Sequence, residues 1–371
     1  MKRGVTVKFT LILAAVLLAA CQKQAAEDGM AISFAAEAKS AAEQSGQRPT
    51  QGNAPALAGA DVPQTRATKT TSANLTAAPF GVYGLYSSTK GAATGTTNVF
   101  DNSSALKVSY STANSQWEYT RTGTDPKYYW KRNMYYRFRA YHPYTASVET
   151  GGSTADGITI NYRIIEDQYD LLVAFATRHP ATDPEGTTRV PMSFQHALSA
   201  LRFRIAFNKT VEAGTTDVLT EFHLTGIQAA GLLNYTHTPG DYLSPLITWS
   251  ADAFDSSTSF YTSTTSRTFG VYNPDDAASS VEPVDIFGSS DTDNVVFAIP
   301  QTCSDPRYGG TAVHFKTTGG GNVDNTAVLP GIEWEPGKIY TYTLLIEKAS
   351  VEIVVSIKDW NEVQSTIDIN I

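Results

Sequence analysis

Cys21 is the residue whose surroundings predict the most definite chemistry. It ends the sequence Leu-Ala-Ala-Cys at residues 18–21, and three basic residues accompany an uncharged apolar run at residues 9–20. That run is too short to cross a bilayer as a stable helix and is typical of a secretory signal peptide. Because small residues followed by cysteine form a bacterial lipobox, we predict a lipoprotein signal peptide at residues 1–20 and acylation of Cys21. An ordinary signal peptide followed by an incidental cysteine is the alternative.

The bond between Arg66 and Ala67 is a candidate for proteolysis. Residues 37–75 are rich in Ala, Ser, Thr, Gln, Gly and Pro. With almost no large apolar side chain, they cannot bury enough surface to offset the entropy of ordering. Arg48 precedes proline, which resists trypsin-like proteases, whereas Arg66 does not. The segment is either a flexible tether that holds a domain off the membrane or a maturation site, and its composition alone favours the tether.

Catalytic and metal-binding patterns are not apparent elsewhere in the sequence. If Cys21 is acylated, Cys303 has no cysteine partner, which excludes a disulfide framework, and its place after an apolar run predicts a core residue. His196 has no triad or metal-ligand pattern beside it, so we expect a structural role. Residues 291–294 lack the glycine and distal glutamate of a calcium loop and are interpreted as a turn. The sequence predicts a non-enzymatic protein without cofactor or metal.

The composition is that of an acidic chain with enough apolar residues for a core. Of its 371 residues, 17% are charged and 42% hydrophobic, and the formal net charge is −8. The length suits two domains of ordinary size. Because an acidic chain without a basic run binds a phosphate backbone poorly, nucleic acid is not expected as a partner.

Short β-strands are the elements that must hold these residues. Residues 30–36 alternate roughly between apolar and other residues and predict one strand ahead of the loose segment. Aromatic and β-branched runs between turn-forming residues predict further strands at 80–86, 117–119, 135–141, 200–207, 295–299, 339–346 and 351–357. No helical period is sustained, so antiparallel sandwiches are expected. The aromatic residues are expected to pack in cores, with a sugar-stacking surface as the alternative.

The C-terminal residues form an apolar ribbon that continues to the last position. Val363, Ile367, Ile369 and Ile371 alternate with polar residues. Most termini are polar and frayed, so such a strand needs a partner. It either pairs within its own domain or is offered to a sheet edge of another molecule.

Short motifs in a fixed order resemble one family. They are Thr-Arg-Ala at 65–67, Phe-Gly-Val-Tyr-Gly at 80–84, Phe-x-Ala-Tyr-x-Pro at 138–143, Asp-Leu-Leu-x-Ala at 170–174, Phe-x-His-Ala-Leu-Ser-x-Leu at 194–201, Phe-x-Ile-Pro-Gln at 297–301, Trp-x-Pro-Gly-Lys-x-Tyr at 334–340 and Asp-Trp at 359–360. With these motifs the chain resembles the fimbrillins, or fimbrillin-like lipoproteins, of Bacteroides-type bacteria, which build type V pili. The motifs span most of the chain beyond Cys21.

The resemblance implies an all-β fold with two antiparallel transthyretin-like β-sandwich domains in tandem. It implies a first strand and cleavable loop at residues 21–78, the rest of the N-terminal domain at 79–190 and a C-terminal domain at 191–371. It also implies that a trypsin-like protease cuts after Arg66, so that the lipid and the first strand leave and open an apolar groove. The C-terminal strand of a neighbouring subunit, with Val363, Ile367, Ile369 and Ile371, would then fill that groove.

The hypothesis that follows is a structural pilus subunit that supports adhesion. Its partners would be other pilus subunits and, through the lipid on Cys21 before cleavage, the outer membrane. The tail after Trp360 is short for a stalk subunit, so a tip, accessory or anchor position stays open. The alternative is a surface-exposed glycan-binding lipoprotein that does not polymerise, which an exposed aromatic platform would favour.

Overall fold

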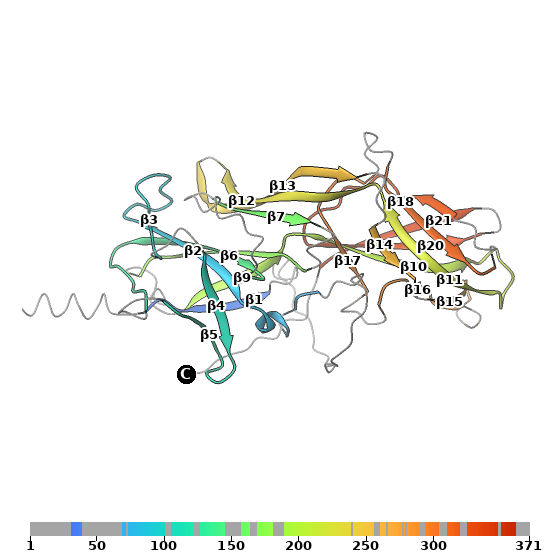
Figure 1. Ribbon diagram of the computed structural model, residues 1–371, viewed down its shortest axis with the longest axis horizontal. Helices are drawn as coiled ribbons and strands as arrows, with labels where there is room; N and C mark the ends of the chain where they lie inside the picture. Colours follow the sequence, from blue (N-terminus) through green and yellow to red (C-terminus); the bar gives the residue numbers. More distant parts are fainter. Residues whose placement is uncertain are drawn as a thin grey trace, which may run out of the picture.

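The computed structural model describes residues 31–38, 69–71, 73–100, 105–121, 127–144, 157–163, 169–180, 189–238, 240–255, 260–264, 266–276, 278, 280–288, 294–303, 310–319, 325–347 and 350–360. Within them the chain is built of strands, with one 3₁₀ turn at Leu75–Ala77. The molecule is elongated, with the N-terminal strands at one end and the C-terminal strands at the other (Figure 1).

The N-terminal end is one sheet that closes on itself. Its order is β3-β2-β4-β5-β1-β9-β8-β6, and β6 pairs back onto β2. The strands are β1 (Phe34–Ala38), β2 (Phe80–Ser87), β3 (Thr97–Asn98), β4 (Leu106–Ser111), β5 (Gln116–Tyr119), β6 (Tyr135–His142), β8 (Leu172–Arg178) and β9 (Val190–His196). We call this closed sheet the N-terminal ring, and β1 is one of its members.

An aromatic core fills the N-terminal ring. Phe34, Phe80, Phe138 and Phe194 are all buried in it. Close packing requires Gly81 of β2, because a Cβ atom there would lie 2.4 Å from the ring of Tyr141 on β6. The predicted use of the aromatic residues in packing is confirmed for this end of the molecule.

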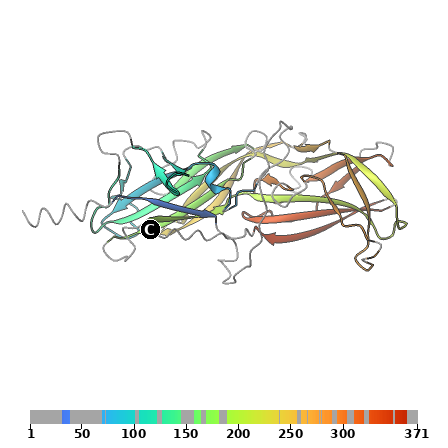
Figure 2. The same ribbon diagram turned by 90° about the horizontal axis from the view of Figure 1, so that it is seen from below.

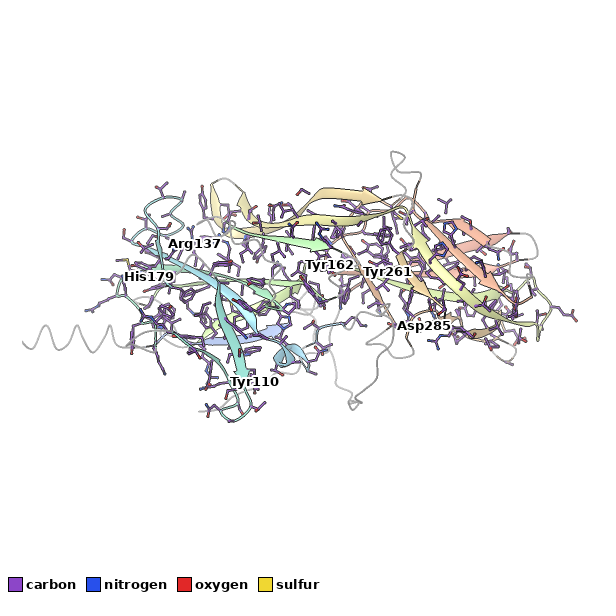
Figure 3. All side chains as sticks on the ribbon, viewed as in Figure 1. Tyr110, Arg137, Tyr162, His179, Tyr261 and Asp285 are labelled. Carbon is purple, nitrogen blue, oxygen red and sulfur yellow. The ribbon has the colours of Figure 1, made fainter. Side chains whose placement is uncertain are left out.

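A three-stranded sheet lies over the upper side of the ring in Figure 1. Its order is β13-β12-β7, formed by β7 (Gly157–Arg163), β12 (Ile227–Thr238) and β13 (Asp241–Asp255). Side chains join it to the ring, since His237 of β12 packs edge-on against Phe175 of β8 with ring centroids 5.5 Å apart. Tyr162 of β7 lies near the middle of the molecule (Figure 3).

The C-terminal end is a ten-stranded sheet. The path β19-β18-β11-β15-β10-β20-β21 is extended by β14 on β11 and by β16 and β17 on β10. The bounds are β10 (Ser199–Asn208), β11 (Thr216–Thr225), β14 (Phe260–Ser263), β15 (Arg267–Tyr272), β16 (Val284–Asp285), β17 (Val296–Ala298), β18 (Ala312–Thr317), β19 (Asn325–Val328), β20 (Lys338–Ile346) and β21 (Val351–Asp359).

Alternating residues of β10 explain why this strand is central to the C-terminal sheet. Leu201, Phe203 and Ile205 are fully buried on one face. On the other face Arg202 makes a bidentate ion pair with Asp285 of β16, with both N–O distances 2.6 Å (Asp285 is labelled in Figure 3). The period of two places apolar side chains inward and charged ones outward.

The predicted all-β class is confirmed, and the predicted strands at 80–86, 135–141, 200–207, 339–346 and 351–357 correspond to β2, β6, β10, β20 and β21. The first predicted strand begins with a bridge at Ala31 and becomes regular at Phe34. The domain division at residues 190–191 remains a prediction. The change from the N-terminal ring to the C-terminal sheet lies a few residues later, between His196 and Ser199.

Candidate functional site: the first strand and its groove

β1 lies between β5 and β9 and closes the N-terminal ring. It runs parallel to β9, with Phe34 opposite Val190 and Ala38 opposite Phe194, and it meets β5 where Phe34 faces Trp117. Figure 2 shows the dark blue β1 lying lengthwise along the ring. Since β2 and β6 already pair on the other side, removing β1 opens the ring between β5 and β9.

Backbone hydrogen bonds fix the residues that lead into β1. The N–H of Ile32 donates to the carbonyl of Tyr128 at 2.7 Å, and the N–H of Val190 donates to the carbonyl of Ser33 at 2.8 Å. The hydroxyl of Tyr119 donates to the carbonyl of Ile32 at 2.9 Å. Without residues 31–38, β5 and β9 would present unpaired backbone N–H and carbonyl groups. Such edges are a template for another strand.

Phe34 fills a pocket made of other aromatic rings. Its ring lies edge-on to Phe80, Phe138 and Tyr119, with centroids 6.1, 5.8 and 6.1 Å away. Ile32 is buried two residues earlier, and both side chains are 1% exposed. Burial of two such side chains stabilises the fold by roughly 3–6 kcal/mol. The first strand and its lead-in therefore place large apolar side chains two positions apart inside the ring.

A buried carboxylate holds the backbone at Thr70. Asp170 Oδ2 accepts a hydrogen bond of 2.8 Å from the backbone N–H of Thr70. Asp170 Oδ1 lies 2.9 Å from Nδ1 of His196, the last residue of β9. The side chains of Asp170 and His196 are 0% and 2% exposed. Thr70 lies four residues after Arg66 in the sequence, and Asp170 joins it to the end of the ring at His196.

His196 continues this contact to the C-terminal end of the described chain. Its imidazole stacks on the indole of Trp360, with centroids 3.8 Å apart and planes 6° apart. Trp360 also stacks on Phe297, and its backbone N–H donates to the carbonyl of Gly337 at 2.9 Å. The residues that follow the loop and those that precede the tail are therefore fixed at one place, here called the junction (Thr70, Asp170, His196 and Trp360).

His142 lies near the junction and is held in its neutral form. Burial lowers its pKa from the usual value, and the charge of Asp170 acts in the opposite direction. Its ring packs edge-on against Phe194 of β9, with centroids 6.1 Å apart. Desolvation dominates because the charged imidazolium is disfavoured in an apolar surrounding.

The residues predicted to carry the function fall outside the described residues. This holds for the signal peptide at 1–20, for Cys21 and Arg66, and for Val363, Ile367, Ile369 and Ile371. Cys303 is buried, as expected for a core residue. In the described part of the chain, no cluster of three metal-ligating residues is found. No helix there has the length and apolar character needed to cross a membrane.

The sequence did not predict how the residues of the junction meet. Asp170 had no signal other than its place at the start of a short motif, and Thr70 had none. The pocket around Phe34 was also missed, because its rings come from strands far apart in the sequence. His196 was expected to be structural, and the structure shows its partners.

The comparison with known families decides which family the chain represents. Residues 65–360 match the family described as fimbrillin-like. The chain belongs to the fimbrillin-like family. The matched segment begins one residue before Arg66 and ends at Trp360, so it leaves β1 and the tail outside. No curated protein matches the chain by sequence.

Comparison with solved structures finds proteins from Bacteroides and Porphyromonas species. A candidate cell adhesion protein from Bacteroides ovatus ATCC 8483 is 14% identical, with a TM-score of 0.51 over 89% of this fimbrillin-like chain and 97% of its own. A fimbrial protein from Bacteroides vulgatus ATCC 8482 is 18% identical, covers 88% and 99%, and has a TM-score of 0.48. The tip fimbrial protein Mfa3 from Porphyromonas gingivalis is 11% identical, covers 80% and 98%, and has a TM-score of 0.34. At these identities, the first structure shows a shared fold alone.

Proposed function

We propose that this protein is a structural, non-enzymatic subunit of a cell-surface pilus whose first strand is exchanged for a strand of a neighbouring subunit. One observation carries the proposal. β1 completes the N-terminal ring and fills its aromatic pocket, yet it lies outside the segment that matches the fimbrillin-like family. A strand that completes the ring but lies outside the matched segment is suited to replacement.

The proposed delivery uses Cys21 and Arg66. The lipid on Cys21 carries the subunit to the outer membrane, and a trypsin-like protease then cuts after Arg66. Cleavage there separates residues 21–66, which include β1, from the rest. The hydrogen bond from Thr70 to Asp170 supports this arrangement, since it would hold the new N-terminal end in place after the cut.

The proposed donor is the C-terminal strand of another copy. Ile367, Ile369 and Ile371 are spaced by two residues, as are Ile32 and Phe34 in the strand that fills the groove. Strand addition gains affinity from backbone hydrogen bonds and specificity from pockets for alternate side chains. The pocket of Phe34 is the one that such an isoleucine would occupy.

The remaining parts of the proposal concern architecture and place. The subunit would have two transthyretin-like sandwich domains, would be exposed at the surface in the fimbrium, and would support adhesion. Tip, stalk and anchor positions remain open. The alternative of an unpolymerised glycan-binding lipoprotein has less support, because Trp130, Tyr136, Phe138 and Tyr141 are buried instead of forming an exposed platform.

Mass spectrometry of the mature protein and an assembly assay test the proposal together. We expect an N-terminus at Ala67 in polymers, and we expect the Arg66→Ala variant to stay monomeric with its lipid intact. Arg48→Ala is the matched control, because it removes an arginine from the same segment but leaves the proposed cut site. A deletion of residues 363–371 should abolish polymers without unfolding the described strands. Polymers formed equally well by Arg66→Ala, or by the deletion variant, would refute the proposal.

A further inference from the structure

A cavity of about 580 Å³ lies at one end of the N-terminal ring. Its wall includes Tyr86 at the end of β2, Asn98 of β3, Tyr136 of β6 and residues 127–132 between β5 and β6. Figure 1 shows β3 at the end of the molecule opposite to β20 and β21. The junction and the groove ends described above do not include its lining side chains.

The cavity carries positive charge in an otherwise acidic protein. Arg121, Lys127, Lys131 and Arg132 line it, and none of its described lining residues is acidic. Glu118 lies outside the lining; hydrogen bonds from Gln116 and Asn114 lower its pKa, and the charge of Lys127 adds a smaller contribution in the same direction. The formal net charge of the whole chain is −8, so the charged side chains among the described lining residues are opposite in sign to the chain as a whole. A concave site with one sign of charge concentrates ligands of the opposite sign.

Aromatic rings hold two of the cations in fixed positions. Lys131 Nζ lies 4.4 Å from the ring centroid of Tyr86, and Arg121 Cζ lies 4.5 Å from that of Tyr128. Such cation–π contacts orient the charged groups before a ligand arrives. Tyr129 adds a side chain that is 38% exposed, which is unusual among the large hydrophobic residues of this chain.

The wall also contains a buried indole. Nε1 of Trp130 is buried and makes no hydrogen bond among the described residues. Asn98 supplies a further amide at the rim. The site therefore combines cations, ring faces and hydrogen-bond donors.

We propose that this cavity binds an acidic saccharide, a sugar that carries carboxylate or sulfate groups. The cations match the acidic groups, and Arg in particular binds them with two parallel hydrogen bonds. The face of Tyr129 suits the C–H face of a pyranose ring, and the amide of Asn98 suits its hydroxyls. An acidic peptide would use the charge but would not need the exposed ring. The proposal goes beyond pilus assembly and does not depend on it.

The test uses the full chain, because the wall is paired with residues before β1 through the 2.7 Å hydrogen bond from Ile32 to Tyr128. Binding of a chondroitin sulfate oligosaccharide is measured by calorimetry at low salt. A neutral N-acetylglucosamine oligosaccharide and polyglutamate of equal charge serve as comparison ligands. The variants are Lys131→Gln with Arg132→Gln, and separately Tyr129→Ala. Lys107→Gln with Lys358→Gln is the matched control, since both lysines are exposed and do not line the cavity.

We expect chondroitin sulfate to bind the parent chain, with at least tenfold weaker binding after the Lys131 and Arg132 substitutions. Tyr129→Ala should weaken binding by severalfold, and the control should match the parent. Circular dichroism checks that each variant is folded. Absence of binding to the parent chain, equal loss in the control, or equally tight binding of polyglutamate would overturn the proposal.

Discussion

The imidazole of His196 lies flat on the indole of Trp360, with ring centroids 3.8 Å apart. His196 ends the last strand of the N-terminal ring, and Trp360 directly follows β21, the last strand of the C-terminal sheet. Nδ1 of the same imidazole lies within hydrogen-bond distance of Asp170, which also accepts a hydrogen bond from the backbone N–H of Thr70. The stack therefore links the two ends of the fold to the segment behind the proposed cut site.

Substitution of Asp170 by asparagine should loosen the junction. The carboxylate accepts from Thr70 and lies within hydrogen-bond distance of His196 while fully buried. Loss of its charge should lower the free energy of unfolding by about 1–3 kcal/mol. Denaturant unfolding measures this, and limited trypsin digestion should show faster cutting after Lys69. Asp275→Asn is the control, because Asp275 makes an exposed pair with Lys209. Equal stability of both variants would contradict the role given to Asp170.

Truncation of Trp360 should also destabilise the fold. The side chain is 2% exposed and stacks on both His196 and Phe297. Trp360→Ala is expected to lower the free energy of unfolding by about 3–5 kcal/mol, as for other large core truncations. Trp360→Phe should cost less, because a ring remains. Val354→Ala, at an exposed position of β21, is the comparison. If Trp360→Ala lowered the free energy of unfolding as little as Val354→Ala does, the result would argue against the stack.

Phe34 should matter in the uncleaved chain and not in the cleaved one. In the uncleaved chain, Phe34→Ala leaves the aromatic pocket empty and should lower the free energy of unfolding by about 3–5 kcal/mol. Phe34→Leu should cost less. After removal of residues 21–66 and filling of the groove by a donor, the parent and variant become the same molecule. Chemical denaturation before and after processing measures both states, and a persistent difference would contradict the exchange.

His142 should make the fold less stable in mild acid. Its folded pKa is below the usual value near 6.5, so the unfolded chain binds a proton that the folded chain resists. The contribution is fully present above the unfolded pKa and is lost as pH falls through the lower folded pKa. The charge of Asp170 opposes this shift but does not reverse it. Replacement by phenylalanine removes the titrating group, so unfolding midpoints from pH 7 to 5 should fall less steeply in His142→Phe. An unchanged slope would refute the assignment.

Local periodicity was sufficient to predict several strands. From Leu201 to Ile205, apolar residues alternate with Arg202 and Arg204, and the burial of β10 alternates over the same five residues. The same holds for β20 and for the partly buried face of β21. Each of these strands carries its signal in its own residues, because one face is packed and the other is not.

Strand partners could not be predicted in this way. Nothing near Phe34 in the sequence indicates that it runs parallel to Val190, or that β2 pairs with β6 to close the ring. Those pairings join residues distant in the chain, and they depend on how whole sheets pack. The junction has the same character: Thr70, Asp170, His196 and Trp360 meet only after both sheets have formed.

The parallel alignment of β1 with β9 has a consequence for any chain of linked copies. In the proposed exchange, a strand from the tail of another copy takes up this alignment, so each copy contributes two unlike surfaces, a groove and a tail. Contacts between unlike surfaces do not close into a two-fold pair, and they repeat in one direction. A filament built through this groove would be polar, with an empty groove at one end and an unused tail at the other.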